Sequence, residues 1–180
     1  SVGRYYVAQR GIDPSHVVRV DVPATDEISD LEFRARLVTP VRRAIDALPR
    51  RVDFILLTTG VPLRVARKNG YSVDALLAGM NLPIPPMVGL DTLWLKRYRN
   101  PYFAARAPFD SDRYGMYLVT RLDCDRLSDC FALVDRATEA RAESGPWFFD
   151  AMPLRTGNDG YADMNRRLYA ADFLVRLMGY

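Results

Sequence analysis

Short apolar runs alternate with helical patterns along the chain, and the apolar runs predict buried strands. The clearest run is Val52 to Thr58, which is too short for an ordinary helix and is followed by Gly60 and Pro62. An apolar run bounded by turn residues is typical of a strand covered on both faces of a parallel sheet. The same reasoning places further strands at residues 17–22, 116–122 and 147–151.

Helical signals separate these runs. Ser29 and Glu32 have the spacing of a capping box, and the helix that they open is expected to reach Leu48 with a kink at Pro40. Ser72 caps a shorter helix through Leu77. Further helices are expected at residues 2–10, at 128–143 with Phe131, Val134 and Ala137 inward, and at 161–178 with Tyr161, Met164, Leu168, Ala171, Val175 and Met178 on one buried face.

Strands that alternate with helices indicate an α/β fold with right-handed crossovers. We expect a three-layer sandwich with a mostly parallel, Rossmann-like sheet, in a single domain over residues 1–180. Its 49% apolar composition suits a domain with a real core. The chain opens in a helix where an α/β unit normally opens in a strand, and it stops two residues after the apolar position Met178. The sheet is therefore expected to be incomplete at both ends. A long irregular loop at about 81–115, rich in proline, is typical of a lid or binding loop.

Charge and cysteine content narrow the function classes only slightly. The net charge of +3 is the difference between 25 basic and 22 acidic residues, so it does not by itself indicate nucleic-acid binding. Cys124 and Cys130 lie six residues apart, which is neither a zinc spacing nor a CxxC redox pair, and this spacing leaves the redox compartment open. No apolar run is long enough to cross a membrane.

Polar residues follow the predicted strands, where open α/β sheets place their ligands. An Arg opposite an Asp at this edge could orient a carboxylate or phosphate. The alternative is that Arg121 and Asp123 simply pair with each other and that Asp74 stabilises the start of its helix. The weak catalytic candidates are Arg121, Asp123 and Cys124. The ligand-binding candidates are Thr58, Thr59, Arg64, Ser72, Asp74 and Asp150.

The sequence gives less support to nucleophilic catalysis, metal binding or a phosphate-binding loop. The single histidine, His16, is expected at the opposite edge of the sheet from Thr59 and Cys124, so a Cys–His pair within this chain is not expected. No metal-ligand spacing occurs, and no metal or cofactor is expected. Pro62 removes an amide donor that a phosphate-binding loop would use.

The segment 64–106 carries the main local excess of basic charge. Seven basic residues stand against Asp74 and Asp91, with aromatic residues interleaved: Arg64, Arg67, Lys68, Lys96, Arg97, Arg99 and Arg106. Such a segment could bind a single nucleic-acid strand or an anionic ligand. We favour a solvated loop anchored by its aromatic residues, and nucleic acid is not the partner we expect.

Four segments in order carry a resemblance: Ile55 to Arg64, Ser72 to Asp74, Asn100 to Phe103 and Met116 to Asp123. Together they resemble a bacterial family, without an established activity, that occurs beside PEP-CTERM/exosortase protein-sorting systems. The resemblance implies a bacterial protein that is exported or periplasmic, with a strand before the first helix and a longer carboxyl-terminal half bearing its own His, Ser and Glu positions. The family tends to have Gly where this chain has Cys124, which argues against a family-wide catalytic cysteine.

Three functional hypotheses follow. The first is an α/β protein linked to the cell envelope or to the sorting of exported proteins, with a protein or small anionic ligand as partner. The second is a hydrolase, in which Thr59-Gly60 and Cys124 occupy places comparable to the catalytic positions of caspase-like peptidases, with the catalytic set completed outside this chain. The third is nucleic-acid or anionic-ligand binding through the segment 64–106.

Overall fold

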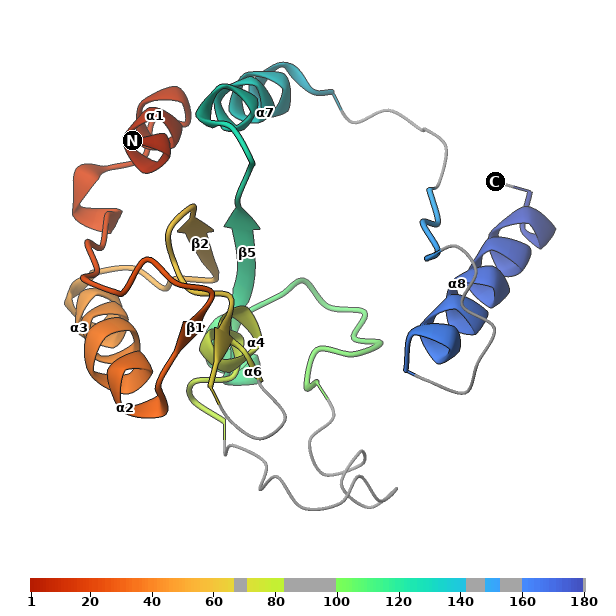
Figure 1. The fold of residues 1–180 in the computed structure, drawn as a ribbon, viewed down its shortest axis with the longest axis horizontal. Helices are drawn as coiled ribbons and strands as arrows, with labels where there is room; N and C mark the ends of the chain where they lie inside the picture. The colour runs from red at the N-terminus through yellow and green to blue at the C-terminus, as the bar shows by residue number, and fades with distance from the viewer. Residues whose placement is uncertain (67–70, 83–99, 142–147, 153–159, 180) are drawn as a thin grey trace. The chain divides into compact units, whose positions relative to one another are not determined.

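The computed structural model describes residues 1–66, 71–82, 100–141, 148–152 and 160–179. The chain divides into two compact units, Ser1–Glu139 and Ala140–Tyr180. Helices and strands are both present, with small sheets in the first unit (Figure 1). An α/β fold class therefore holds, while a single domain across residues 1–180 stays a prediction.

The two longest strands lie side by side in the first unit (Figure 1). β2 (Phe54–Thr58) and β5 (Leu118–Leu122) pair in parallel, from Phe54 opposite Leu118 to Thr58 opposite Leu122. Both strands were expected from their apolar runs, and both are confirmed together with their parallel direction.

A second small sheet lies beside this pair. β1 (Glu27–Ile28) pairs in parallel with β3 (Arg64–Val65), and β3 pairs in antiparallel fashion with β4 (Tyr71–Ser72). Each of these strands has only two residues. The alternation of apolar and polar side chains that identifies a strand in a sequence needs a longer segment, so these strands could not be predicted.

The beginning of the chain is helical, as expected. α1 (Val2–Gln9) ends before Gly11, whose φ of +58° suits glycine, and a 3-10 helix follows at Pro14–His16. The predicted strand at residues 17–22 is wrong, because these residues form no strand hydrogen bonds with any described part of the chain. The alternating Val18, Val20 and Val22 nevertheless pack against the core. The apolar pattern therefore reflects the partial burial of these side chains and not strand pairing.

The helical segment that begins after Ser29 also forms. The Ser29 Oγ accepts from the Glu32 amide at 3.3 Å and donates to the Glu32 carboxylate at 2.7 Å, as the capping box predicts. α2 (Asp30–Glu32), a π-helical turn (Phe33–Val38) and α3 (Thr39–Ala47) then follow without a break. The expected irregularity therefore lies in the π-helical turn before Pro40, which shifts the hydrogen-bond register ahead of the proline.

The core of the first unit joins α3, both sheets and α4 (Val73–Ala78). Its buried residues are Ile28, Phe33, Leu37, Val41, Leu57, Val65, Val73 and Leu77. α6 (Ser111–Tyr114) lies within the described part of the predicted loop at 81–115, of which residues 83–99 are outside the described residues.

α7 (Leu127–Glu139) packs against α1, where Tyr5 contacts Phe131 and donates a 2.6 Å hydrogen bond to Asp135. Of the three residues predicted to face inward, Val134 is buried, Phe131 is half-buried and Ala137 is exposed. The buried stripe runs instead through Cys130 and Val134, one helical turn apart, so the predicted face was rotated.

The second unit contains α8 (Gly160–Leu177). Ala162 and Asn165 are the buried residues of this helix. The predicted stripe is wrong at Tyr161, Met164 and Met178, which are exposed. The Asn165 amide accepts from the Met152 N–H and donates to its carbonyl, so a polar side chain takes an inward position. Of the predicted strand at 147–151, the described residues 148–151 form no strand.

No helix in the described segments combines the length and the hydrophobicity needed to cross a bilayer.

Asp53, directly before β2, should make folding sensitive to acid. Its carboxylate accepts from Arg51 and from the Ser111 amide at 2.9 Å, and these hydrogen bonds, the Arg51 contact first, lower the pKa of Asp53 against the opposing effect of burial. A lowered folded-state pKa stabilises the protein above the unfolded-state value of about 3.9, and this stability is lost as pH falls through the folded-state pKa.

We therefore expect Asp53→Asn to flatten the decline of the urea midpoint below about pH 4, with lower stability than the wild type at neutral pH. Urea unfolding between pH 2.5 and 7 measures this. Asp46→Asn, an exposed change of the same charge, is the control. An Asp53→Asn curve that parallels the wild type at every pH would contradict the assignment.

Candidate functional site

The candidate site is the edge of the sheet where β2 and β5 end together. The Thr59 amide donates to the Leu122 carbonyl at 3.1 Å and continues the ladder one residue past β2. Gly60 then turns the chain with a φ of +98°, a conformation that residues with a Cβ rarely adopt. The loop from Thr59 to Leu63 thus starts from a fixed point on the sheet.

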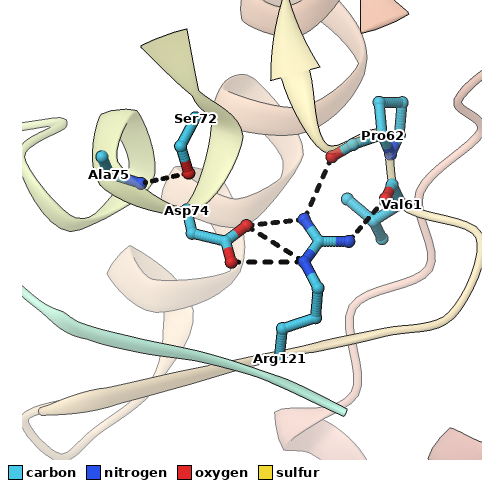
Figure 2. Close-up of polar contacts among 6 residues, drawn as sticks. All are labelled: Val61, Pro62, Ser72, Asp74, Ala75 and Arg121. Carbon is cyan, nitrogen blue, oxygen red and sulfur yellow. Dashed lines mark hydrogen bonds and ion pairs between the residues drawn. The ribbon is translucent and has the colours of Figure 1, made fainter. Parts of the chain in front are cut away.

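Arg121 organises this edge from its position near the end of β5 (Figure 2). Its Nε and Nη2 donate to the Asp74 carboxylate at 2.5–3.2 Å. Its Nη1 donates to the Val61 carbonyl at 2.6 Å, and Nη2 donates to the Pro62 carbonyl at 3.0 Å. Only 12% of the Arg121 side chain is exposed. All three guanidinium nitrogens are therefore engaged within the protein.

The partner of Arg121 lies in the first turn of α4. The Ser72 Oγ caps this helix by accepting from the Ala75 amide at 3.3 Å, and Asp74 follows two residues later (Figure 2). The side chain of Asp74 is 31% exposed, more than that of Arg121. Asp74, and not the Asp123 that the sequence placed beside Arg121, is the partner, and the contacts of Arg121 fasten β5, the loop at Val61-Pro62 and α4 together.

The two threonines after β2 have different surroundings. Thr58 lies against α1, since a Cβ on Gly3 would be 3.7 Å from the Thr58 Cγ2. The Thr59 hydroxyl lies 3.5 Å from the Leu122 carbonyl oxygen and 3.9 Å from the Cys130 Sγ. Thr59 thus points toward the beginning of α7.

Cys124 and Cys130 form a disulfide that links the end of β5 to α7, with their Cα atoms 5.7 Å apart. The Cys124 amide donates to the Asp123 carboxylate at 3.1 Å, which shapes the turn between the two elements. A disulfide sulfur is not a thiolate nucleophile. The sequence spacing did not reveal this pairing, although a strand end followed closely by the first turns of a helix is a placement that could have suggested it.

The remaining candidates lie elsewhere. Arg64, on β3, pairs with Glu27 across the small sheet, and this contact raises the pKa of the Arg64 guanidinium. Asp150 belongs to the second unit, whereas β2 and β5 belong to the first. Of the basic segment 64–106, Arg67, Lys68, Lys96, Arg97 and Arg99 lie outside the described residues.

Within the described ranges, His, Cys, Asp and Glu side chains form no group of three that could hold a metal ion. His16 ends the 3-10 helix before residues 17–22. The contacts at the strand-end edge thus fix its loops in place, and the role of Arg121, Asp123 and the other candidates in binding stays a prediction.

Comparison of the chain with protein-family models, with curated proteins and with solved structures finds no significant match in any of the three.

Proposed function

We propose that this protein is a bacterial cell-envelope protein with a binding role in the sorting of exported proteins. The observation that carries the proposal is the disulfide between Cys124 and Cys130, at the edge of the sheet where α/β proteins bind their ligands. Structural disulfides persist in oxidising compartments such as the periplasm and are rare in the bacterial cytosol. The resemblance of four segments to a sorting-associated family points to the same compartment.

The proposal includes a three-layer, Rossmann-like arrangement of the first unit. Support comes from β2, whose Leu57 lies in the core with Val41 of α3, while its Thr58 lies against Gly3 of α1. Neighbouring residues of a strand point to opposite faces, so β2 has helices on both sides. The parallel pairing of β2 with β5 agrees with this arrangement.

A binding role fits the strand-end edge better than self-contained hydrolysis. The sulfur of Cys124 is bound to Cys130, and the guanidinium of Arg121 is occupied by Asp74 and two carbonyls. A cysteine nucleophile must be a thiolate, which a disulfide sulfur is not, and a guanidinium stays protonated and acts only as a donor. The loop at residues 59–63, held by Arg121, is instead a rigid surface suited to recognition.

The direct test is deletion of the gene in the bacterium that encodes it, followed by quantification of exported proteins bearing carboxyl-terminal sorting signals. We expect these proteins to shift between the envelope and the medium, with restoration by the wild-type gene and not by an empty vector. An unchanged distribution in the deletion strain would contradict the sorting role.

A further inference from the structure

A groove of about 410 Å³ lies on the first unit, lined by the helical residues 33–46 and by the end of α4. Part of its lining is apolar. Phe33 belongs to the core, and Val38, Leu76 and Met80 are half-buried side chains that pack against the core. Covering the apolar surface that such side chains leave in water is favourable. The groove therefore keeps apolar area that a ligand could cover.

The helical period places charged residues beside this apolar lining. Val38, Arg42 and Asp46 follow one another at intervals of four residues, so they are neighbours along one face of the helix. Val41 is buried in the core, on a different face of the same helix. One side of α3 thus packs inside the protein, and another side forms a charged wall of the groove.

Two of the arginines at the groove are already engaged. Arg34 pairs with Asp30 at 2.9 Å, which neutralises its charge. The Arg42 Nη2 donates to the Met80 carbonyl at 2.9 Å and to the Asn81 side-chain oxygen at 3.3 Å. These contacts hold α3 to the segment after α4. Because both acceptors of Arg42 are neutral, its positive charge stays at the groove without an ionic partner.

Arg43 is the arginine with donors to spare. It is exposed, and among the described residues it makes neither a hydrogen bond nor an ion pair. A guanidinium has five N–H donors arranged to match a carboxylate. Asp46 brings one negative charge to the lining, whereas Arg42 and Arg43 bring two uncompensated positive charges. The groove is therefore apolar in one part and positively charged in another.

We propose that this groove binds a free fatty acid. The aliphatic chain covers Val38, Leu76 and Met80, and the carboxylate accepts a bidentate pair of hydrogen bonds from Arg43 beside the charge of Arg42. The volume falls in the range of about 300–1,000 Å³ that is usual for small-molecule sites. This binding site is additional to the sorting role and does not depend on it.

The size of the groove favours a small amphiphile over a macromolecule. Nine residues line it, whereas a stable protein–protein interface takes about 20–30 residues from each side. An uncharged apolar ligand would leave Arg43 without an acceptor, and a cationic one would be repelled. A single chain that ends in a carboxylate satisfies both parts of the lining.

Titration of the full-length protein with dodecanoate, below its micelle-forming concentration and at neutral pH, tests the proposal. We expect saturable binding by calorimetry with a Kd below about 1 mM. In amide NMR spectra, the largest shifts should occur at Val38, Arg43 and Met80. Acetate, which has the head group without the chain, and dodecyltrimethylammonium, which has the opposite charge, should each bind at least about tenfold more weakly.

Two substitutions separate the contributions of charge and chain. Arg43→Gln should weaken dodecanoate binding about tenfold by removing the charge-assisted hydrogen bonds, and Met80→Gln should weaken it about fivefold by making the lining polar. Arg50→Gln is the matched control, because Arg50 is also exposed but does not line the groove. All three variants should melt within about 2 °C of the wild type, so that weaker binding is not a sign of unfolding.

Several results would overturn the proposal. These are the absence of saturable binding, equal binding of the cationic amphiphile, or an Arg43→Gln variant that binds like Arg50→Gln. Shifts centred on Val18 and Leu56 would place the chain in the apolar cavity beside β2 instead. Binding to phosphatidylglycerol vesicles without binding of free dodecanoate would identify a membrane surface as the ligand. Each of these outcomes leaves the sorting role intact, because that role rests on the disulfide and its compartment.

Discussion

Replacing Arg121 with Met should lower the free energy of unfolding by about 3 kcal/mol. Met keeps the apolar stem but removes every donor, so the Asp74 carboxylate and the carbonyls of Val61 and Pro62 lose their partners. Removing one member of a buried pair costs about 3–5 kcal/mol, and the partial exposure of Asp74 places this case at the lower end. Thermal and urea unfolding should show a melting temperature lower by roughly 6–12 °C.

A matched control is available on the surface. Arg34 pairs with Asp30 one turn earlier on the same helix, and the side chain of Arg34 is 56% exposed. Arg34→Gln should change the melting temperature by no more than about 2 °C, because exposed pairs contribute little. The double variant Arg121→Met/Asp74→Asn should be less destabilised than the sum of its single changes, since each single change leaves a partner unpaired.

Loss of activity without loss of stability would instead assign Arg121 to ligand binding. If Arg121→Met abolished binding or turnover while the melting temperature matched that of Arg34→Gln, the guanidinium would be serving a substrate and not the loop at Val61-Pro62. Such a result would contradict the structural role that Figure 2 indicates.

Loss of the disulfide should have the second largest effect. Cys124 and Cys130 are six positions apart. In the loop-entropy model, closing so short a loop lowers the entropy of the unfolded chain and raises the free energy of unfolding by about 2 kcal/mol. Cys124→Ser/Cys130→Ser should therefore unfold at a lower urea concentration than the oxidised wild type. Burial of Cys130 at the start of α7 should add to the cost of the polar serine.

Reductant supplies the control for this pair of substitutions. The wild type should lose a comparable amount of stability in a thiol reductant, while the double serine variant should not respond to it. A wild type that unfolds identically with and without reductant would mean that the disulfide contributes nothing to the folded state.

The elements that sequence patterns predicted well are those with local signals. β2 and the beginning of β5 are apolar on consecutive positions, and the Ser29 and Ser72 caps depend on atoms three residues apart. Local chemistry was sufficient in each of these cases because the strands and caps are fixed by short stretches of backbone. The Arg121–Asp74 pair was not predicted, because Arg121 was expected to pair with Asp123 and Asp74 to stabilise the start of its helix.

The predictions were wrong where the structure of a segment depends on a partner elsewhere in the chain. Residues 17–22 have a strand-like pattern but no strand partner among the residues that the structure describes, and no local signal contains that information. On α7 and α8 the helical period was right, while the buried face depended on what each helix packs against: Tyr5 of α1 near Phe131, and Met152 near Asn165. The disulfide likewise required β5 and α7 to be placed in space.

The most direct test of the envelope assignment is the thiol state of residues 124 and 130 in living cells. Cells of the organism that encodes the protein are quenched with acid, free thiols are labelled with a maleimide, and the envelope and cytoplasmic fractions are analysed by peptide mass spectrometry. The account predicts that the protein is in the envelope fraction, with both cysteines unlabelled and joined to each other. Labelled cysteines in a cytoplasmic protein would contradict it.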